Sequence, residues 1–263
     1  MAGIKFVSQD FILTDINPFT GMKYDDKWIY MELSETEDYL LLDKTENHLF
    51  QIYVSKLYSE WHWRIMDFIG YESEYGKNII INIGRNDYEY AKEHYRGHSY
   101  KDKELRDYEK KILVHSTPYK NYCSIKKMNT LLSWNKLKEA GIIEETEPIG
   151  SLLGDHAEYR DYIMFSDGGV GGEIVVNSRN HSKLIMDIKA EYEPGARMYF
   201  DAQKIAADGK LVRDGLHYKV KDYLPLNPYL LGTATKDNVD LPDMECSPVN
   251  FSQAADKMFL NLK

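Results

Sequence analysis

Apolar and polar residues alternate over several short stretches of the chain, the pattern that a β-strand with one buried face produces. In the first hundred residues this alternation predicts two strands, Lys5–Leu13 and Trp28–Leu33, and a short apolar run predicts a buried strand at Asn78–Ile83. Leu49–Met66 has apolar residues at mixed helical spacing and predicts a helix, although the alternation at Trp61–Trp63 also fits a strand. A second helix is predicted over Asp87–Tyr95, because Gly97 would end it. This region is therefore expected to mix helices and strands.

Short strands dominate the pattern after a charged stretch at Tyr100–Lys111, which is expected to be a domain boundary or a surface helix. The predicted strands are Ile112–Val114, Tyr162–Phe165, Ile174–Val176, Leu184–Ile188, Met198–Phe200 and Leu216–Val220. Helices are predicted over Asn121–Met128, over Trp134–Ala140 with Ser133 as its cap, and from Asp201 to Gly209. Many short strands with few helices are typical of a twisted, mainly antiparallel α+β domain.

Length and charge narrow the class of protein. The chain has 263 residues, enough for one large domain or two small ones, and its net charge of −9 argues against a protein that coats nucleic acid without regard to sequence. Residues 100–127 are the exception, with 8 basic and 4 acidic side chains. The 21 tyrosines can serve as amphipathic packing residues or as stacking platforms for a base, and packing is the preferred interpretation.

The sequence carries no signal for a membrane span or a secretion leader, so we expect a soluble, cytoplasmic protein with no membrane partner. Cys123 and Cys246 are too few to staple a scaffold of this size and are expected to stay reduced. His94 and His98 have the spacing of a helical zinc pair, but Tyr95 stands where a zincin has glutamate. No metal site is therefore predicted.

A glycine-rich stretch, Ser166–Gly172, invites a nucleotide-binding interpretation. A dinucleotide fingerprint needs a third glycine at the opening of a helix, but that position is Ile174, inside a predicted strand. We interpret the stretch as a mobile hairpin between strands, which can still border an active site.

His115, Ser116 and Thr117 follow a predicted strand and precede a predicted helix. At such a place a histidine can hydrogen-bond a ribose hydroxyl, a serine or threonine can hold an amide, and the start of a helix favours a phosphate. An ordinary turn at the end of a strand uses the same residue types. From the residues alone, both interpretations stay open.

Several motifs around this segment resemble those of the ADP-ribosyltransferase superfamily, and most of all those of its RNA 2′-phosphotransferases. His115 and Thr117, followed by a helix with Asn121 and Ser124, resemble the family's first NAD-binding motif. The further matches, in chain order, are Arg96–Ser99 to a Gln-Gly-His-Ser motif, Arg160–Ser166 to an Arg-x-His-Val-His-Leu-Ser strand, Met198–Gly209 to a strand with an Asp-Ala helix, and Gly215–Tyr218 to an Asn-Gly-Val strand. The resemblance covers about residues 94 to 232, roughly half the chain.

The resemblance implies an architecture and a set of site residues. Residues 100–235 would form a twisted, mainly antiparallel split sheet of the ADP-ribosyltransferase type, after a mixed α/β N-terminal domain of unknown role (1–99) and before a C-terminal tail (236–263). NAD would be the co-substrate, held by His115, Ser116, Thr117 and Asn121. The catalytic side chains would be Arg160, Arg179 and His217, and an acceptor such as RNA would meet Arg96, His98 and Ser99.

Enzymes of this superfamily break the bond between nicotinamide and ribose through an oxocarbenium-like transition state. The resemblance thus implies a transferase that passes ADP-ribose to an RNA 2′-phosphate or another macromolecule. Tyr162 and Met164 replace histidines of the family's middle strand, and His217 stands where the toxin-like branch has its catalytic glutamate. Two alternatives therefore stay open: a catalytically degenerate nucleotide-sensing or protein-binding module of the same fold, and an ADP-ribosylating toxin or phage-type effector.

Overall fold

The chain folds into two compact units. The computed structural model describes residues 3–8, 10–36, 49–143, 147–153, 155–241 and 246–261. Unit 1 comprises residues 1–100 and 213–216, and unit 2 comprises residues 101–212 and 217–263. Unit 1 is thus discontinuous in the sequence. Residues 213–216, at the end of a strand that begins in unit 2 and in the turn after that strand, belong to unit 1.

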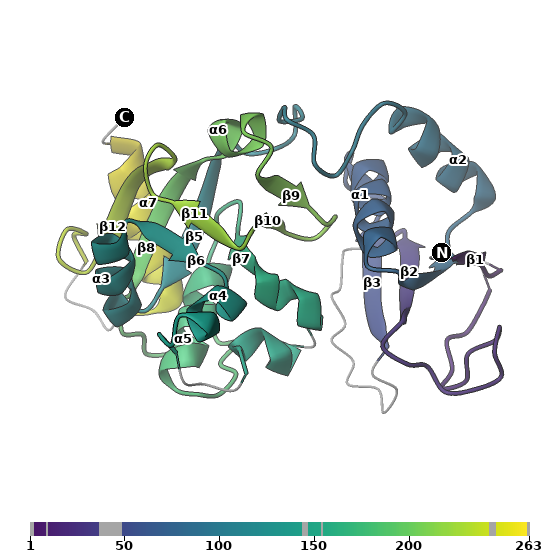
Figure 1. The fold of residues 1–263 in the computed structure, drawn as a ribbon, viewed down its shortest axis with the longest axis horizontal. Coiled ribbons are helices and arrows are strands. Elements are labelled where there is room, and N and C mark those ends of the chain that lie inside the picture. The colour runs from purple at the N-terminus through teal and green to yellow at the C-terminus, as the bar shows by residue number, and fades with distance from the viewer. Residues whose placement is uncertain are drawn as a thin grey trace. The chain divides into compact units, whose positions relative to one another are not determined.

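Unit 1 is a parallel sheet with a helix packed on one face. Its elements are β1 (Ile4–Phe6), β2 (Trp28–Ser34), β3 (Phe50–Ser55), α1 (Trp61–Glu74), β4 (Asn78–Asn82) and α2 (Arg85–His94). The strand order is β1-β4-β2-β3, and every neighbouring pair is parallel. Helix α1 lies along this sheet, where its Ile65 and Phe68 join strand residues such as Ile52 in one apolar cluster (Figure 1). Burial of this aliphatic surface stabilises the unit.

Residues 213–216 complete unit 1 at helix α1. A Cβ atom added to Gly215 would lie 2.3 Å from the carbonyl oxygen of Arg64 and 3.0 Å from Cβ of Phe68. Gly215 also has φ +81°, which disfavours any residue with a side chain. Leu216 packs against the apolar cluster under α1. A glycine is therefore required for this segment to approach the helix backbone.

Unit 2 contains the remaining elements. They are β5 (Ile112–Thr117), α3 (Tyr119–Met128), β6 (Thr130–Leu132), α4 (Trp134–Glu139), the 3₁₀ helices η1 (Ile149–Leu153) and η2 (Ala157–Asp161), β7 (Tyr162–Phe165), α5 (Gly171–Asn180), β8 (Ala196–Asp201), α6 (Ala202–Ala207), β9 (Leu211–Arg213), β10 (Tyr218–Lys221), β11 (Tyr223–Pro225), β12 (Leu230–Thr235) and α7 (Pro248–Asn261). The sheet orders are β12-β8-β5, β7-β10-β9 and β11-β6. The paired strands β5/β8, β8/β12, β7/β10 and β6/β11 are all antiparallel. Within the described ranges the protein is thus an α+β protein with seven α-helices, mostly antiparallel sheets and one parallel sheet.

Helix α7, which lies in the segment expected as a C-terminal tail (236–263), belongs to the core of unit 2. Phe251, Ala255 and Phe259 of α7 lie in the same apolar cluster as Tyr199 of β8. The rings of Tyr199 and Phe259 stack with centroids 4.0 Å apart. An amphipathic helix buries its apolar face, and the face of the β12-β8-β5 sheet provides that surface.

Three secondary-structure predictions are wrong for identifiable reasons. Ile174–Val176 lies in helix α5 rather than in a strand. Within the helix Val176 is buried and Val175 is exposed. Leu184–Ile188 alternates like a strand but pairs with none of the strands in the described ranges. Leu49–Met66 divides into strand β3 and the first turns of α1.

Other predictions are confirmed by the structure. Strands β4, β7 and β8 and helices α2, α3, α4 and α6 lie where the pattern predicts them, within a few residues. The side chain of Ser133 accepts a hydrogen bond from the backbone of Lys136 as the cap of α4, and Asp201 does the same for α6. The buried core includes Tyr24, Tyr30, Tyr71, Tyr159, Tyr162, Tyr192, Tyr199 and Tyr229, which favours the packing interpretation of the tyrosines. None of the described helices has both the length and the apolar character that a bilayer crossing takes.

Candidate functional site

Strand β5 carries the predicted NAD-binding motif, and its residues alternate between two apolar clusters. Leu113 faces the cluster that contains Phe165, whereas Val114 faces the cluster that contains residues of α7. Successive side chains of a strand point to opposite faces of the sheet. His115 is therefore on the side of Leu113 and Thr117, and Ser116 is on the other side. The three residues predicted to bind NAD do not share one face.

The ring of His115 is fixed by a backbone carbonyl. Its Nδ1 atom lies 3.0 Å from the oxygen of Met164 in β7, and its ring centroid lies 5.8 Å from that of Phe165. A carbonyl oxygen only accepts, so Nδ1 donates. In the neutral ring Nε2 is then the acceptor.

Burial lowers the pKa of His115 below its ordinary value. The hydrogen bond to Met164 acts in the opposite direction, and the positive charge of Arg179 on α5 adds to the lowering. The histidine is therefore neutral at pH 7. The strand with His115 and the strand with Met164 thus meet at one imidazole.

Ser116 is engaged in a buried network on the opposite face of β5. Its hydroxyl donates to Oε1 of Glu173 over 2.6 Å, and Oε2 of Glu173 accepts from Nη1 of Arg197 over 2.8 Å. The guanidinium of Arg197 also binds both oxygens of Asp256, over 2.8 and 3.1 Å. Tyr199 donates to Asp256 over 2.8 Å. The network joins β5, α5, β8 and α7.

Glu173 and Arg197 are both fully buried, with side chains that are 0% exposed. Burial raises the pKa of Glu173, against the opposing effects of Arg197 and Ser116. A buried carboxylate is tolerated only where it is paired and hydrogen-bonded, as this one is on both oxygens. The sequence did not reveal Glu173, because Ser116 and Arg197 are far from it along the chain.

The glycine-rich stretch connects β7 to α5, so it opens a helix rather than a strand. The prediction of a hairpin between strands is therefore wrong. The dinucleotide fingerprint is still missing, because Ile174 occupies the third glycine position and β7 pairs antiparallel with β10. Gly168 and Gly169 have φ values of +123° and +71°, which require glycine.

The predicted catalytic residues occupy different surroundings. Arg160 in η2 forms an ion pair with Glu147, and among the described residues no hydrogen bond or ion pair joins it to His115. Arg179 lies in the last turn of α5. The ring of His217 meets Tyr159 edge to face at 5.6 Å. Of the three, Arg179 is the one that acts on His115. Asn121, predicted to hold NAD, is half-buried in α3.

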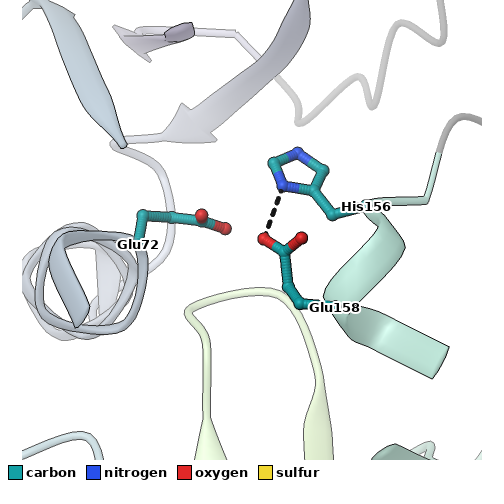
Figure 2. Close-up of side chains that lie close together, drawn as sticks. All are labelled: Glu72, His156 and Glu158. Atoms are coloured by element: carbon teal, nitrogen blue, oxygen red, sulfur yellow. Dashed lines mark hydrogen bonds and ion pairs between the residues drawn. The ribbon is translucent and has the colours of Figure 1, made fainter. Parts of the chain in front are cut away.

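A second group of polar side chains surrounds Tyr159 in unit 2. Nδ1 of His156 lies 3.0 Å from Oε1 of Glu158, and Figure 2 shows this bond beside helix η2. The His156 ring stacks on Tyr159 at 5.5 Å. The ammonium of Lys219 lies 3.8 Å from the centroid of the Tyr159 ring, as a cation–π contact. Sequence reasoning missed Lys219, because a lysine on a strand ordinarily points to solvent.

The predicted acceptor residues Arg96, His98 and Ser99 belong to unit 1, where they follow α2 and are exposed. The His98 ring meets Trp63 of α1 edge to face at 4.7 Å. His94 binds the carbonyl oxygen of Tyr90 through Nδ1. These contacts give His98 and His94 packing partners within unit 1.

Comparison with known proteins adds no relative: no family model, no curated protein and no solved structure matches the chain.

Proposed function

We propose that unit 2 is an NAD-dependent transferase of the ADP-ribosyltransferase type, which breaks the bond between nicotinamide and ribose and passes ADP-ribose to an RNA 2′-phosphate or another macromolecular acceptor. The proposal includes a cytoplasmic location, where NAD is available and where Cys123 and Cys246, which form no disulfide, would stay reduced.

The observation that carries the proposal is the hydrogen bond that joins two of the resembling motifs at His115. The ring comes from the first motif, its hydrogen-bond acceptor comes from the strand of the Arg160–Ser166 motif, and the charge of Arg179 acts on it. Motifs that were matched separately in the sequence are thus joined through one side chain.

The chemistry of His115 and Arg179 supports NAD as the ligand. A neutral imidazole with Nε2 as acceptor suits a ribose hydroxyl or an amide N–H, and Arg179 suits an anionic oxygen. When bound, NAD would supply an electrophilic ribose carbon with nicotinamide as its leaving group. Ser116 does not face the same side, so its part is to hold Glu173 rather than NAD.

Replacing His115 by alanine tests the proposal. We expect NAD to bind roughly tenfold more weakly or worse, as follows from losing a hydrogen bond in a partly buried site, and nicotinamide release to fall in parallel. His94→Ala is the matched control, because His94 is an exposed histidine of unit 1 with no part in this site. Calorimetry measures the NAD affinity, and chromatography measures the nicotinamide released with RNA bearing an internal 2′-phosphate.

Other results would contradict the proposal. A wild-type protein that binds no NAD, or equal affinities for the wild type and His115→Ala, would remove NAD from this site. Label transfer to DNA or protein rather than RNA would retain the reaction and favour the effector alternative.

The ion pair of Arg160 with Glu147 favours a second candidate, a nucleotide-sensing module without turnover. An arginine held by a carboxylate is less available to an incoming phosphate. In that case NAD would raise the melting temperature of the protein, and no nicotinamide would be released.

A further inference from the structure

Three consecutive residues of β5 each bind the segment that contains β7 and the glycine-rich stretch. The backbones of Val114 and Ser166 exchange two hydrogen bonds, over 2.8 and 2.9 Å. His115 binds the carbonyl of Met164, two residues earlier. Ser116 binds Glu173, seven residues after Ser166. The chain from 166 to 173 therefore leaves β5 at Val114, one residue before His115, and returns to it at Ser116, one residue after His115 and on the opposite face of the strand.

The return to β5 depends on two features of α5. The first is the carboxylate of Glu173, which reaches Ser116 on one oxygen and Arg197 on the other. The second is Gly172, at which an added Cβ would lie 2.6 Å from Oγ of Ser116. Only a glycine allows the helix to approach the serine this closely. The close contact at Gly172 and the hydrogen bond of Glu173 both hold the start of α5 at Ser116.

Three glycines between the two attachments have open space beside them. A Cβ built on Gly168, Gly169 or Gly171 meets no atom within 4 Å. Gly171 does not have a positive φ either, so its lack of a side chain is required neither by packing nor by backbone conformation.

We propose that Glu173 is a positioning residue, which holds the loop 167–171 beside His115 so that the loop borders the nucleotide site. The inference rests on the proposed function for its ligand. It gives the buried ion pair with Arg197 a second role, in which Arg197 orients the carboxyl group of Glu173 so that the other oxygen binds Ser116.

Ser116→Ala tests the inference with little change to the core. It removes the hydrogen bond between Ser116 and Glu173 and leaves the ion pair of Glu173 with Arg197 in place. Tyr199→Phe is the matched control, because it removes one hydrogen bond from the same network at Asp256, away from the loop. Ser116→Thr keeps the hydroxyl and should behave like the wild type.

Two measurements are needed, hydrogen exchange of the amides of residues 166–173 without NAD and the affinity for NAD. For Ser116→Ala we expect exchange to be about tenfold faster and NAD binding about tenfold weaker, equivalent to one hydrogen bond to a charged group. Tyr199→Phe and Ser116→Thr should change neither.

The outcomes separate the inference from the proposed function. If Ser116→Ala weakens NAD binding without faster exchange, the serine touches the ligand and the positioning role is wrong. Faster exchange with unchanged affinity would show that the loop does not border the site, and unchanged exchange and affinity would also overturn the inference. If the wild type binds no NAD, the proposed function fails, and the exchange data still decide whether Glu173 holds the loop.

Discussion

Both units pack a helix on an apolar face of a sheet, and unit 2 adds a buried ion pair to that packing. In unit 1 the face of the sheet under α1 is aliphatic, with residues such as Ile29, Ile52 and Ile79 against Phe68. In unit 2 the sheet β12-β8-β5 meets α5 and α7 around the ion pairs of Arg197. Apolar packing tolerates small changes of volume, whereas an ionic network fails when one partner is removed.

The difference indicates where geometry matters most. The apolar contacts under α1 hold the helix on the sheet, but such contacts have no preferred direction. Glu173 and Arg197 fix particular oxygens and nitrogens, and they do so next to the strand of His115. A buried network of this kind is costly in free energy and gives orientation in return, so its place beside the candidate site is consistent with a function there.

The largest effect is expected from Arg197→Met. This substitution leaves the carboxylate of Glu173 buried without its cation, so unit 2 should lose about 3–5 kcal/mol of unfolding free energy. Chemical denaturation measures the total loss. Hydrogen exchange locates it, with faster exchange in residues 112–117 and 196–201 and little change in residues 50–55. A loss below about 1 kcal/mol would show that the ion pairs contribute no more than a surface pair does.

The pH dependence of the unfolding free energy tests the buried surroundings of His115 in unit 2. The pKa of His115 is lowered in the folded state, so the unfolded chain binds more protons at mildly acidic pH. Stability from the neutral ring is full above the ordinary histidine pKa of about 6.5 and is lost as the pH falls below it, by at most about 1.4 kcal/mol per pH unit.

His115→Gln isolates this contribution, because Glu173 has a raised pKa and acts in the opposite direction at lower pH. The difference in unfolding free energy between the wild type and His115→Gln should shrink between pH 7 and pH 5.5. A difference that stays constant across this range would mean that the ring titrates normally in the folded protein.

The smallest effect is expected in unit 1. Ile52→Val removes one methylene from the buried cluster under α1 and should cost about 0.5–1.5 kcal/mol. Exchange should become faster in residues 50–55 and 78–82 and stay unchanged in residues 112–117. A cost as large as that of Arg197→Met would remove the contrast between the aliphatic and the ionic core.

Local signals in the sequence were sufficient for much of the secondary structure. Ser133 and Asp201 act as helix caps as predicted, since a cap depends on residues three positions apart. The apolar run at Asn78–Ile83 also predicted β4 from neighbouring residues alone. Ile174–Val176 misled because three β-branched residues favour a strand by composition, and the glycines before them gave no opposing local signal.

Long-range features could not be predicted in this way. The parallel order of unit 1 places β4 between β1 and β2, and nothing in the single segments specifies those neighbours. Glu173 was missed because its partners Ser116 and Arg197 come from strands distant in the sequence. His115 was predicted as a site residue because its type, its place after a predicted strand and the resembling motifs around it coincide in the sequence.

Residues 213–216 have a consequence for how the chain folds during synthesis. Unit 1 consists mostly of the first hundred residues, yet Gly215 and Leu216 complete its packing around α1. A ribosome makes these residues only after all the strands from β1 to β9, whereas domains generally fold as they emerge. Gly215 and Leu216 therefore become available to pack on α1 only after most of unit 2 has been translated.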